Sequence, residues 1–311
     1  MADSAFSEKL PTLQLFWDSV SSGLMKECAY KYMLAQIEGW RSREDNIDLT
    51  FGILLHEGRE MYYRSRARGV SHDDSLVLVL DQVLTSSWDE KLNRPWQGDE
   101  RKNRYTLCRS LVWYLDHFEN DPLETRIMRN GEPMVELSFR FGLGFFSSTN
   151  EEFHLCGHLD RVADYSGLQV WVNDTKTTKS SLDEGSSSWF FKGFTPDNQV
   201  SLYSYAASVV LEKPASGVML DGVQIAQDFT RIARAPITRT RAQLAEWLDN
   251  FREMLDRANR YAMAGKWPQN DKACFRCSFR RVCALPPAER PGALSRDFVK
   301  RPWNPLAVRG E

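Results

Sequence analysis

The chain has 311 residues, of which 42% are hydrophobic and 26% charged, the composition of an ordinary globular protein. Its 40 basic and 42 acidic residues give a formal charge of −2, so a nucleic-acid site must be a local basic surface. No apolar run could cross a membrane, and residues 1–15 lack a secretory-signal pattern. We therefore expect a cytoplasmic protein that is not bound to a membrane.

Helical periodicity dominates the first part of the chain. It predicts helices over four segments: 12–40 with a break near Gly23, 51–68, 71–84 and 107–118. Ser71 is a favourable N-cap, because its hydroxyl can accept a free backbone N–H. We treat residues 57–130 as a helical insert in a single domain that spans residues 1–311.

The period then changes to the two-residue alternation of strands. Strands are predicted over 135–141, 153–165 and 168–173, with a hairpin over 217–238. Two more helices are expected: one that begins at Pro196 and ends near Leu211, and one from Thr240 to about Gly265. This order of elements predicts an α/β domain with a helical insert.

Three of the six cysteines lie close together, at Cys274, Cys277 and Cys283. Two residues separate the first pair and five separate the second, and a two-residue gap lets both thiolates of a turn point at one metal centre. Cys28 is the better fourth ligand, since Cys108 and Cys156 have the sequence context of small core residues. Four thiolates suit either Zn²⁺ or an iron–sulfur cluster, and their spacing does not choose between the two. Residues 266–311 form the segment with this cysteine cluster and a basic tail.

Two acids and a lysine lie on neighbouring predicted strands. A tight turn at 165–167 joins the strands of Asp160 and Asp174, so the two carboxylates can meet. Asp174 and Lys176 are two residues apart and share one face of a strand. Such acids could hold Mg²⁺ or Mn²⁺, while the lysine holds or deprotonates an attacking water.

Segments 157–161 and 174–177 resemble the core of the PD-(D/E)XK nuclease superfamily, and more narrowly its RecB-type exonuclease branch. Gln199 and Tyr203 match the Gln-x-x-x-Tyr motif of this branch, and His56 ends a match to its Gly-x-x-x-His element. The resemblance implies a restriction-endonuclease-like core, in which helices flank a mixed central sheet.

The resemblance further implies a metal-dependent exonuclease that hydrolyses phosphodiester bonds in single-stranded or end-processed DNA and leaves 5′-phosphate ends. Mg²⁺ or Mn²⁺ would be held by four groups: His56, Asp160, Asp174 and the Thr175 carbonyl. Lys176 would orient the attacking water, and Gln199 and Tyr203 would position the DNA strand.

The branch has an iron–sulfur subset, which includes the CRISPR-adaptation exonucleases and the nuclease domain of AddB. Its pattern of one N-terminal cysteine and a C-terminal Cys-x₂-Cys-x₅-Cys is matched by Cys28, Cys274, Cys277 and Cys283. This match implies a structural [4Fe–4S] cluster, with a zinc-stabilised nuclease as the alternative. Joining residues so distant in sequence would stabilise the fold.

A competing hypothesis is a non-catalytic DNA-binding or assembly subunit that retains the nuclease fold. The presence of Asp160, Asp174 and Lys176 favours catalysis. The chain lacks a Gly-x-x-x-x-Gly-Lys motif, so a helicase, recombinase or replication partner would be a separate protein. Basic residues over 231–241 and 271–311 predict a DNA-binding surface, with an ordinary solvated surface as the alternative.

Three features have two interpretations each. Glu136 is either a metal ligand, as an acid near this point is in some related nucleases, or a surface charge. Arg161 contacts either phosphate or an acid. The aromatic residues of segment 189–194, which includes Lys192, either stack on unpaired bases or anchor a loop on the core.

Overall fold

The computed structural model describes residues 4–43, 46–90 and 92–306 and contains two compact units. Unit 1 consists of residues 1–45, 138–157 and 241–311, and unit 2 of residues 46–137 and 158–240. Two long strands, β6 (Val135–Phe146) and β7 (Glu152–Tyr165), contribute residues to both units. The division into an insert at 57–130 and a tail at 266–311 stays a prediction.

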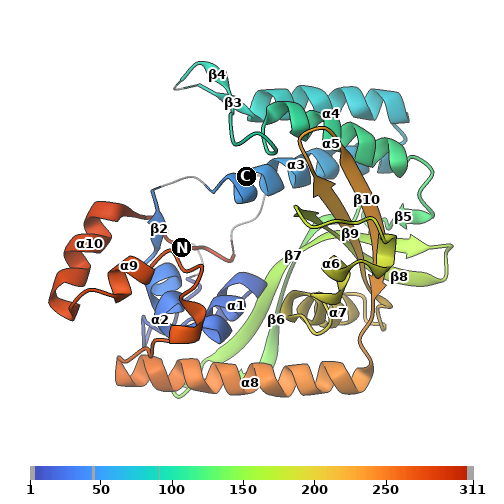
Figure 1. Ribbon diagram of the computed structural model, residues 1–311. Coiled ribbons are helices and arrows are strands. Elements are labelled where there is room, and N and C mark those ends of the chain that lie inside the picture. Colours follow the sequence, from blue (N-terminus) through green and yellow to red (C-terminus); the bar gives the residue numbers. More distant parts are fainter. Residues whose placement is uncertain (1–3, 44–45, 91, 307–311) are drawn as a thin grey trace. The chain divides into compact units, whose positions relative to one another are not determined.

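Three helices of unit 2 confirm the predicted periodicity (Figure 1): α3 (Ile47–Ala67), α4 (His72–Ser86) and α5 (Arg104–His117). The side chains of Asn46, Ser71 and Asn103 each accept a backbone N–H at the start of these helices. Their apolar faces form one buried cluster that includes Phe51 and Leu111.

The sheet of unit 2 is mixed, as predicted. Its strands are β5 (Leu123–Thr125), the second half of β7, β8 (Gln169–Thr178), β9 (Gly217–Ile225) and β10 (Thr230–Ile237). β7 pairs antiparallel with β5 and β8, β8 pairs parallel with β9, and β9 pairs antiparallel with β10. The parallel pair requires a crossover, which contains α7 (Asn198–Val210).

Helices cover both faces of this sheet. The side chains of Thr175 and Asp221 face α5, where the Tyr114 hydroxyl donates to Asp221 Oδ2 at 2.6 Å. The next residue of β9, Gly222, faces the opposite side and contacts α6 (Trp189–Lys192) through Phe190. Figure 1 shows α6 and α7 beside β8 and β9.

The predicted start of α7 was wrong. The helix begins at Asn198, and Asp197 caps it by accepting the N–H of Val200 at 2.9 Å. Both Pro196, as a first helical residue, and the Asp197 carboxylate, as an N-cap, favour a helix start here. The cap determines the observed start.

The N-terminal part of unit 1 also differs from the prediction of a helix over 12–40. Phe16 and Trp17 form β1, which pairs parallel with β7. α1 (Ser19–Glu27) contains Gly23, and the break falls at Cys28, whose φ of −161° is extended. The buried carboxylate of Asp18 caps α1 and directs the chain from strand to helix.

The C-terminal part of unit 1 packs on the segment after Cys28. β11 (Phe298–Lys300) pairs antiparallel with β2 (Trp40–Ser42). Phe298 of β11 belongs to a buried cluster that also contains Leu34 and Phe279. The long predicted helix is α8 (Arg241–Ala264). The remaining elements are α2 (Ala29–Tyr32), the π-helix η1 (Met33–Ile37), β3 (Trp88–Asp89), β4 (Arg94–Pro95), η2 (Gly185–Ser187), η3 (Asp271–Ala273), α9 (Arg280–Cys283), η4 (Pro287–Glu289) and α10 (Arg290–Asp297).

No helix in the described ranges is sufficiently long and apolar to pass through a lipid bilayer.

Candidate active site and cysteine cavity

The β7–β8 register brings the two predicted acids together. The pairing runs from Tyr165↔Gln169 to Val162↔Val172, and its continuation places Asp160 opposite Asp174. Both residues are buried, and their carboxyl groups are close enough for each to shift the pKa of the other. The turn length therefore determines which acids meet.

Helix α3 places His56 against the same strands. Its Nε2 lies 2.9 Å from the Thr175 carbonyl oxygen, and its Nδ1 lies 2.9 Å from Asp160 Oδ2. That carboxylate oxygen is buried, yet no hydrogen bond of normal geometry reaches it. Three of the predicted metal ligands thus contact one another around an unsatisfied anionic oxygen, an arrangement that fits a cation.

Glu136 joins this group. Its carboxylate lies within 4.8 Å of the ligand atoms of His56 and Asp160, and the residue is 8% exposed. Its φ of +49° is unusual for a residue with a side chain, and such strain is common at functional sites. The surface-charge interpretation of Glu136 is therefore wrong: it is a buried acid beside the predicted ligands.

The charges of the site act on one another. Burial would raise the pKa of Asp160, but the charges of His56 and Lys176 hold it below its usual value. Burial and the charge of Asp160 raise the pKa of Asp174. Two adjacent carboxylates resist simultaneous ionisation, so a bound cation would stabilise them.

Lys176 is paired with one of these acids. Its Nζ lies 2.8 Å from Asp174 Oδ2, and its side chain is 28% exposed. Burial would lower the pKa of Lys176, but the charges of Asp174 and Asp160 raise it. The ammonium group is therefore retained at the site as a hydrogen-bond donor.

Helix α7 contributes Gln199 and Tyr203. The Gln199 Nε2 donates to the Tyr203 hydroxyl at 2.9 Å, as expected from their spacing of four residues. Tyr203 is 7% exposed; its burial and the charges of Asp160 and Asp174 raise its pKa. The tyrosine thus faces the acid group as a neutral hydroxyl.

Behind the acids lies Arg59, which sequence reasoning missed. Its side chain is 3% exposed, its Nη1 lies 3.9 Å from Asp160 Oδ2, and its Nη2 donates to Asn173 Oδ1 at 3.1 Å. The sequence does hold a signal for Arg59. It lies three residues after His56, and this spacing puts a charged side chain on the buried face of α3.

Arg59 borders a buried network of charges. Arg234 bridges Asp121 and Asp221, and Arg161 pairs with Asp121 at 3.4 Å. The acid-pairing interpretation of Arg161 is therefore supported. The exposed basic surface predicted over 231–241 was wrong at Arg234, which is largely enclosed. In this network two Asp face two Arg, and the charge of Arg59 acts on both Asp221 and Asp160.

The four predicted cluster cysteines meet in unit 1. Cys28, Cys274, Cys277 and Cys283 line one cavity of about 60 Å³. Asn270 connects its two sides: its backbone N–H lies 3.4 Å from Cys28 Sγ, and its side chain donates to the Glu27 carbonyl. All four cysteines are free, and Cys277 and Cys283 also pack against the core of unit 1.

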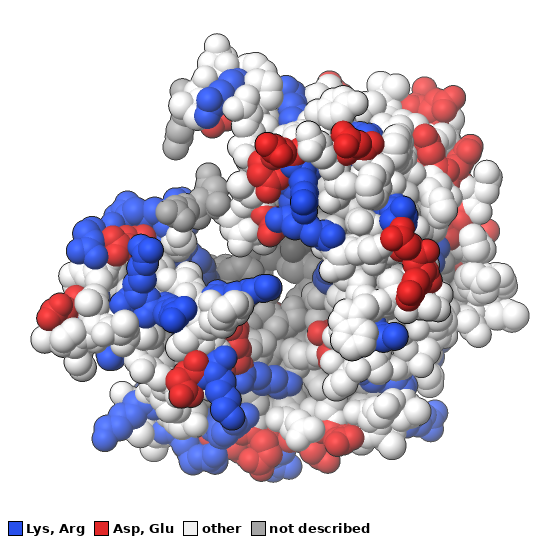
Figure 2. Space-filling view, in the orientation of Figure 1, with Lys and Arg blue, Asp and Glu red and all other residues white. Residues whose placement is uncertain are grey.

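Basic side chains lie on the two helices that contain or follow Cys283. Figure 2 shows Lys and Arg gathered over α9 and α10. Arg280, Arg281, Arg290 and Arg296 belong to these two helices.

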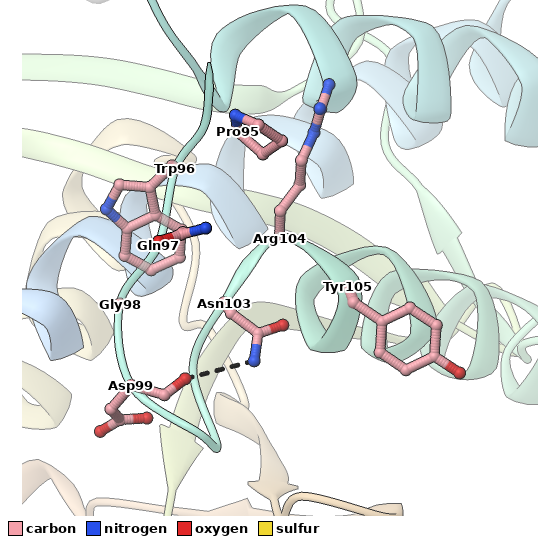
Figure 3. A pocket seen from close by; sticks show the side chains of 8 residues that line it. All are labelled: Pro95, Trp96, Gln97, Gly98, Asp99, Asn103, Arg104 and Tyr105. Atoms are coloured by element: carbon pink, nitrogen blue, oxygen red, sulfur yellow. Dashed lines mark hydrogen bonds between the residues drawn. The ribbon is translucent and has the colours of Figure 1, made fainter. Parts of the chain in front are cut away.

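A second pocket lies on unit 2, near the start of α5. It measures about 380 Å³ and is lined by the loop after β4 together with Asn103, Arg104 and Tyr105 (Figure 3). Asn103 Nδ2 closes the loop by donating to the Asp99 carbonyl at 3.2 Å. None of the predicted site residues lines this pocket, so it does not mark the candidate active site.

The predicted fold is confirmed by comparison with known proteins. The family model described as "PD-(D/E)XK nuclease superfamily" matches residues 23–284, which contain all the candidate site residues. A proposed exonuclease from Eubacterium rectale is similar in structure, with a TM-score of 0.50 and 12% identity over 100% of this chain and 98% of that one. At that identity the likeness concerns the fold alone, a restriction-endonuclease-like α/β core.

The structure of SSO0001 is 16% identical over 86% of this chain and 96% of that one, with a TM-score of 0.30. No curated protein sequence matches the chain.

Proposed function

The chain belongs to the PD-(D/E)XK nuclease superfamily, and we propose that it is a metal-dependent DNA exonuclease of the RecB-type branch. The observation that carries this proposal is the convergence of His56, Asp160 and the Thr175 carbonyl around an unsatisfied buried oxygen. Asp174, Lys176 and Glu136 complete a group that combines cation ligands with a cationic donor.

The donor set fits Mg²⁺ or Mn²⁺, which prefer carboxylate and carbonyl oxygen and accept imidazole. The holding groups would be His56, Asp160, Asp174 and the Thr175 carbonyl, with Glu136 as a further acid. A bound ion would polarise the phosphodiester and lower the pKa of a bound water. Lys176 would hold the attacking water or the phosphate oxygen by hydrogen bonding.

Gln199 and Tyr203 would position the DNA strand. The tyrosine hydroxyl is held by Gln199 and remains protonated, so it can donate to a phosphate oxygen. The proposed substrate is single-stranded or end-processed DNA. A helicase, recombinase or replication partner and a cytoplasmic location stay predictions.

The alternative of a non-catalytic subunit is disfavoured because the acids and lysine are retained and contact one another. The test is digestion of end-labelled single-stranded and duplex DNA in Mg²⁺ or Mn²⁺ by wild type and Asp174→Ala. We expect cleavage by the wild type alone. Equal cleavage by both proteins would place the active centre elsewhere, and cleavage by neither would favour the non-catalytic subunit.

We also propose that the four cysteines hold a structural [4Fe–4S] cluster. Their convergence on one cavity supports a shared metal centre. Four thiolates also suit tetrahedral Zn²⁺. The cluster is proposed because Cys28 and the C-terminal Cys-x₂-Cys-x₅-Cys resemble the iron–sulfur subset of the RecB-type branch.

The cofactor can be identified in protein purified without oxygen. We expect a brown solution with visible absorption and about four iron atoms per chain. Colourless protein containing one zinc ion would instead establish the zinc-stabilised alternative. Cys28→Ser should reduce metal content, while Cys156→Ser should not, because Cys156 is buried in β7.

A further inference from the structure

The short helix α6 combines one buried ring and one half-buried ring with an exposed one. Phe191 is 3% exposed, and the Phe190 ring lies 5.1 Å from it and 5.2 Å from that of Phe194. Trp189, by contrast, is 80% exposed. Phe190 and Phe191 pack against the sheet at Gly222, and the Trp189 ring is left in solvent.

α6 packs one strand away from the candidate site. In the parallel β8–β9 pair, Gly222 is the register partner of Lys176. A Cβ at Gly222 would lie 3.0 Å from a Phe190 ring carbon and 3.1 Å from one of Phe191. Register partners point to the same face and their strands are about 4.8 Å apart. The anchoring rings therefore cover the sheet face that carries Asp174 and Lys176.

A cation accompanies the exposed ring. Lys192 is three residues after Trp189 on the same side of α6, and its Nζ lies 5.4 Å from the indole centroid. Because the Trp189 ring is exposed, it does not contribute to the fold the stabilisation that a buried tryptophan provides. The pair offers a flat stacking surface and a positive charge, which suit a nucleobase and its phosphate.

We propose that Trp189 and Lys192 form a binding site for an unpaired nucleobase and adjacent phosphate of the DNA strand that occupies the candidate active site. This inference rests on the proposed nuclease function for the identity of the strand. Bases inside a duplex are covered on both faces by their neighbours, so the indole can stack only on an unpaired or terminal base. The site therefore favours single strands and frayed ends.

The test is fluorescence anisotropy with a labelled thymidine oligonucleotide and a blunt duplex, in EDTA to prevent metal-dependent cleavage. Trp189→Ala should weaken single-strand binding by about 5- to 150-fold, the loss expected for one base stack. Trp189→Phe should retain most of the affinity because it keeps a ring. Lys192→Ala should weaken binding mainly at low salt. Duplex binding should change less than single-strand binding.

Tyr105→Ala is the matched control, since Tyr105 is 74% exposed on α5 of the same unit. If Trp189→Ala binds the oligonucleotide as tightly as Tyr105→Ala does, the proposal is overturned. Equal losses for single-stranded and duplex DNA would also overturn it, because stacking on an unpaired base predicts a difference.

Cleavage by wild-type protein in Mn²⁺ tests the proposed function separately. Loss of binding in Trp189→Ala without any wild-type cleavage would reject the nuclease activity and leave the binding site supported. Wild-type cleavage together with unchanged binding in Trp189→Ala would reject only the binding site.

Discussion

Replacement of Arg59 by methionine should destabilise the protein strongly, because this guanidinium compensates a buried carboxylate. At 3.9 Å from Asp160 Oδ2 and an effective dielectric constant of about 20, the attraction is about 4 kcal/mol. The side chains of Arg59 and Asp160 are only 3% and 10% exposed, so solvent screens the pair weakly. Breaking a buried pair costs about 3–5 kcal/mol, and we expect Arg59→Met to lose a similar amount of unfolding free energy.

Urea denaturation followed by circular dichroism measures this loss. Arg126→Met is the matched control: Arg126 pairs with Asp164 of β7 at 2.8 Å, but both side chains are 29% exposed. That loss should stay below about 1 kcal/mol. Adding Asp160→Asn to Arg59→Met should recover roughly 1–3 kcal/mol, since it removes the uncompensated charge.

The reasoning is refuted if Arg59→Met loses no more stability than Arg126→Met does. It is also refuted if Asp160→Asn gives no recovery in the Arg59→Met background, because the two side chains would then contribute independently.

Glu136→Gln should weaken Mn²⁺ binding at least about tenfold by removing a negative charge from the ligand group; equal affinities by calorimetry would contradict this. Burial would raise the pKa of Asp221, but hydrogen bonds and charge from Arg234 hold it below 3.8. The ionised Asp221 carboxylate therefore stabilises the folded state fully above pH 3.8, and this contribution is lost as the pH falls further. The urea midpoints at pH 3 and pH 5 should differ more in wild type than in Asp221→Asn. Gly222→Ala should cost about 1–3 kcal/mol, because its Cβ would lie 3.0–3.1 Å from three side chains. Gly23→Ala, where no atom outside the local helix lies within 4 Å, should melt at or above the wild-type temperature.

Much of the candidate site could be predicted because it depends on short-range spacing. A tight turn relates Asp160 to Asp174, strand periodicity places Asp174 and Lys176 on one face, and helical periodicity places Gln199 next to Tyr203. The helices over 51–68 and 71–84 were visible for the same reason. Each relation involves residues close in sequence or joined by one turn, so local geometry determines it.

Some local predictions failed because similar signals compete. Residues 12–40 contain enough apolar spacing for a helix, yet Phe16 and Trp17 pair with β7 and Cys28 adopts an extended conformation. Tertiary pairing outweighed helical propensity there. Pro196 favours a helix that begins at the proline, and the adjacent Asp197 favours one that begins after it as an N-cap. The Asp197 cap determined the first residue of α7.

By itself, the sequence determined the α/β order of elements, the acid pair with its lysine and the four cysteines. Only the tertiary structure decided what surrounds them: Glu136 in a strained conformation beside the ligands, Arg59 as the buried charge behind Asp160, and Trp189 rather than its phenylalanine neighbours as the exposed ring. Periodicity and spacing follow from the local geometry of helices and strands. Burial and charge compensation depend on segments brought together from distant parts of the chain, which no local pattern specifies.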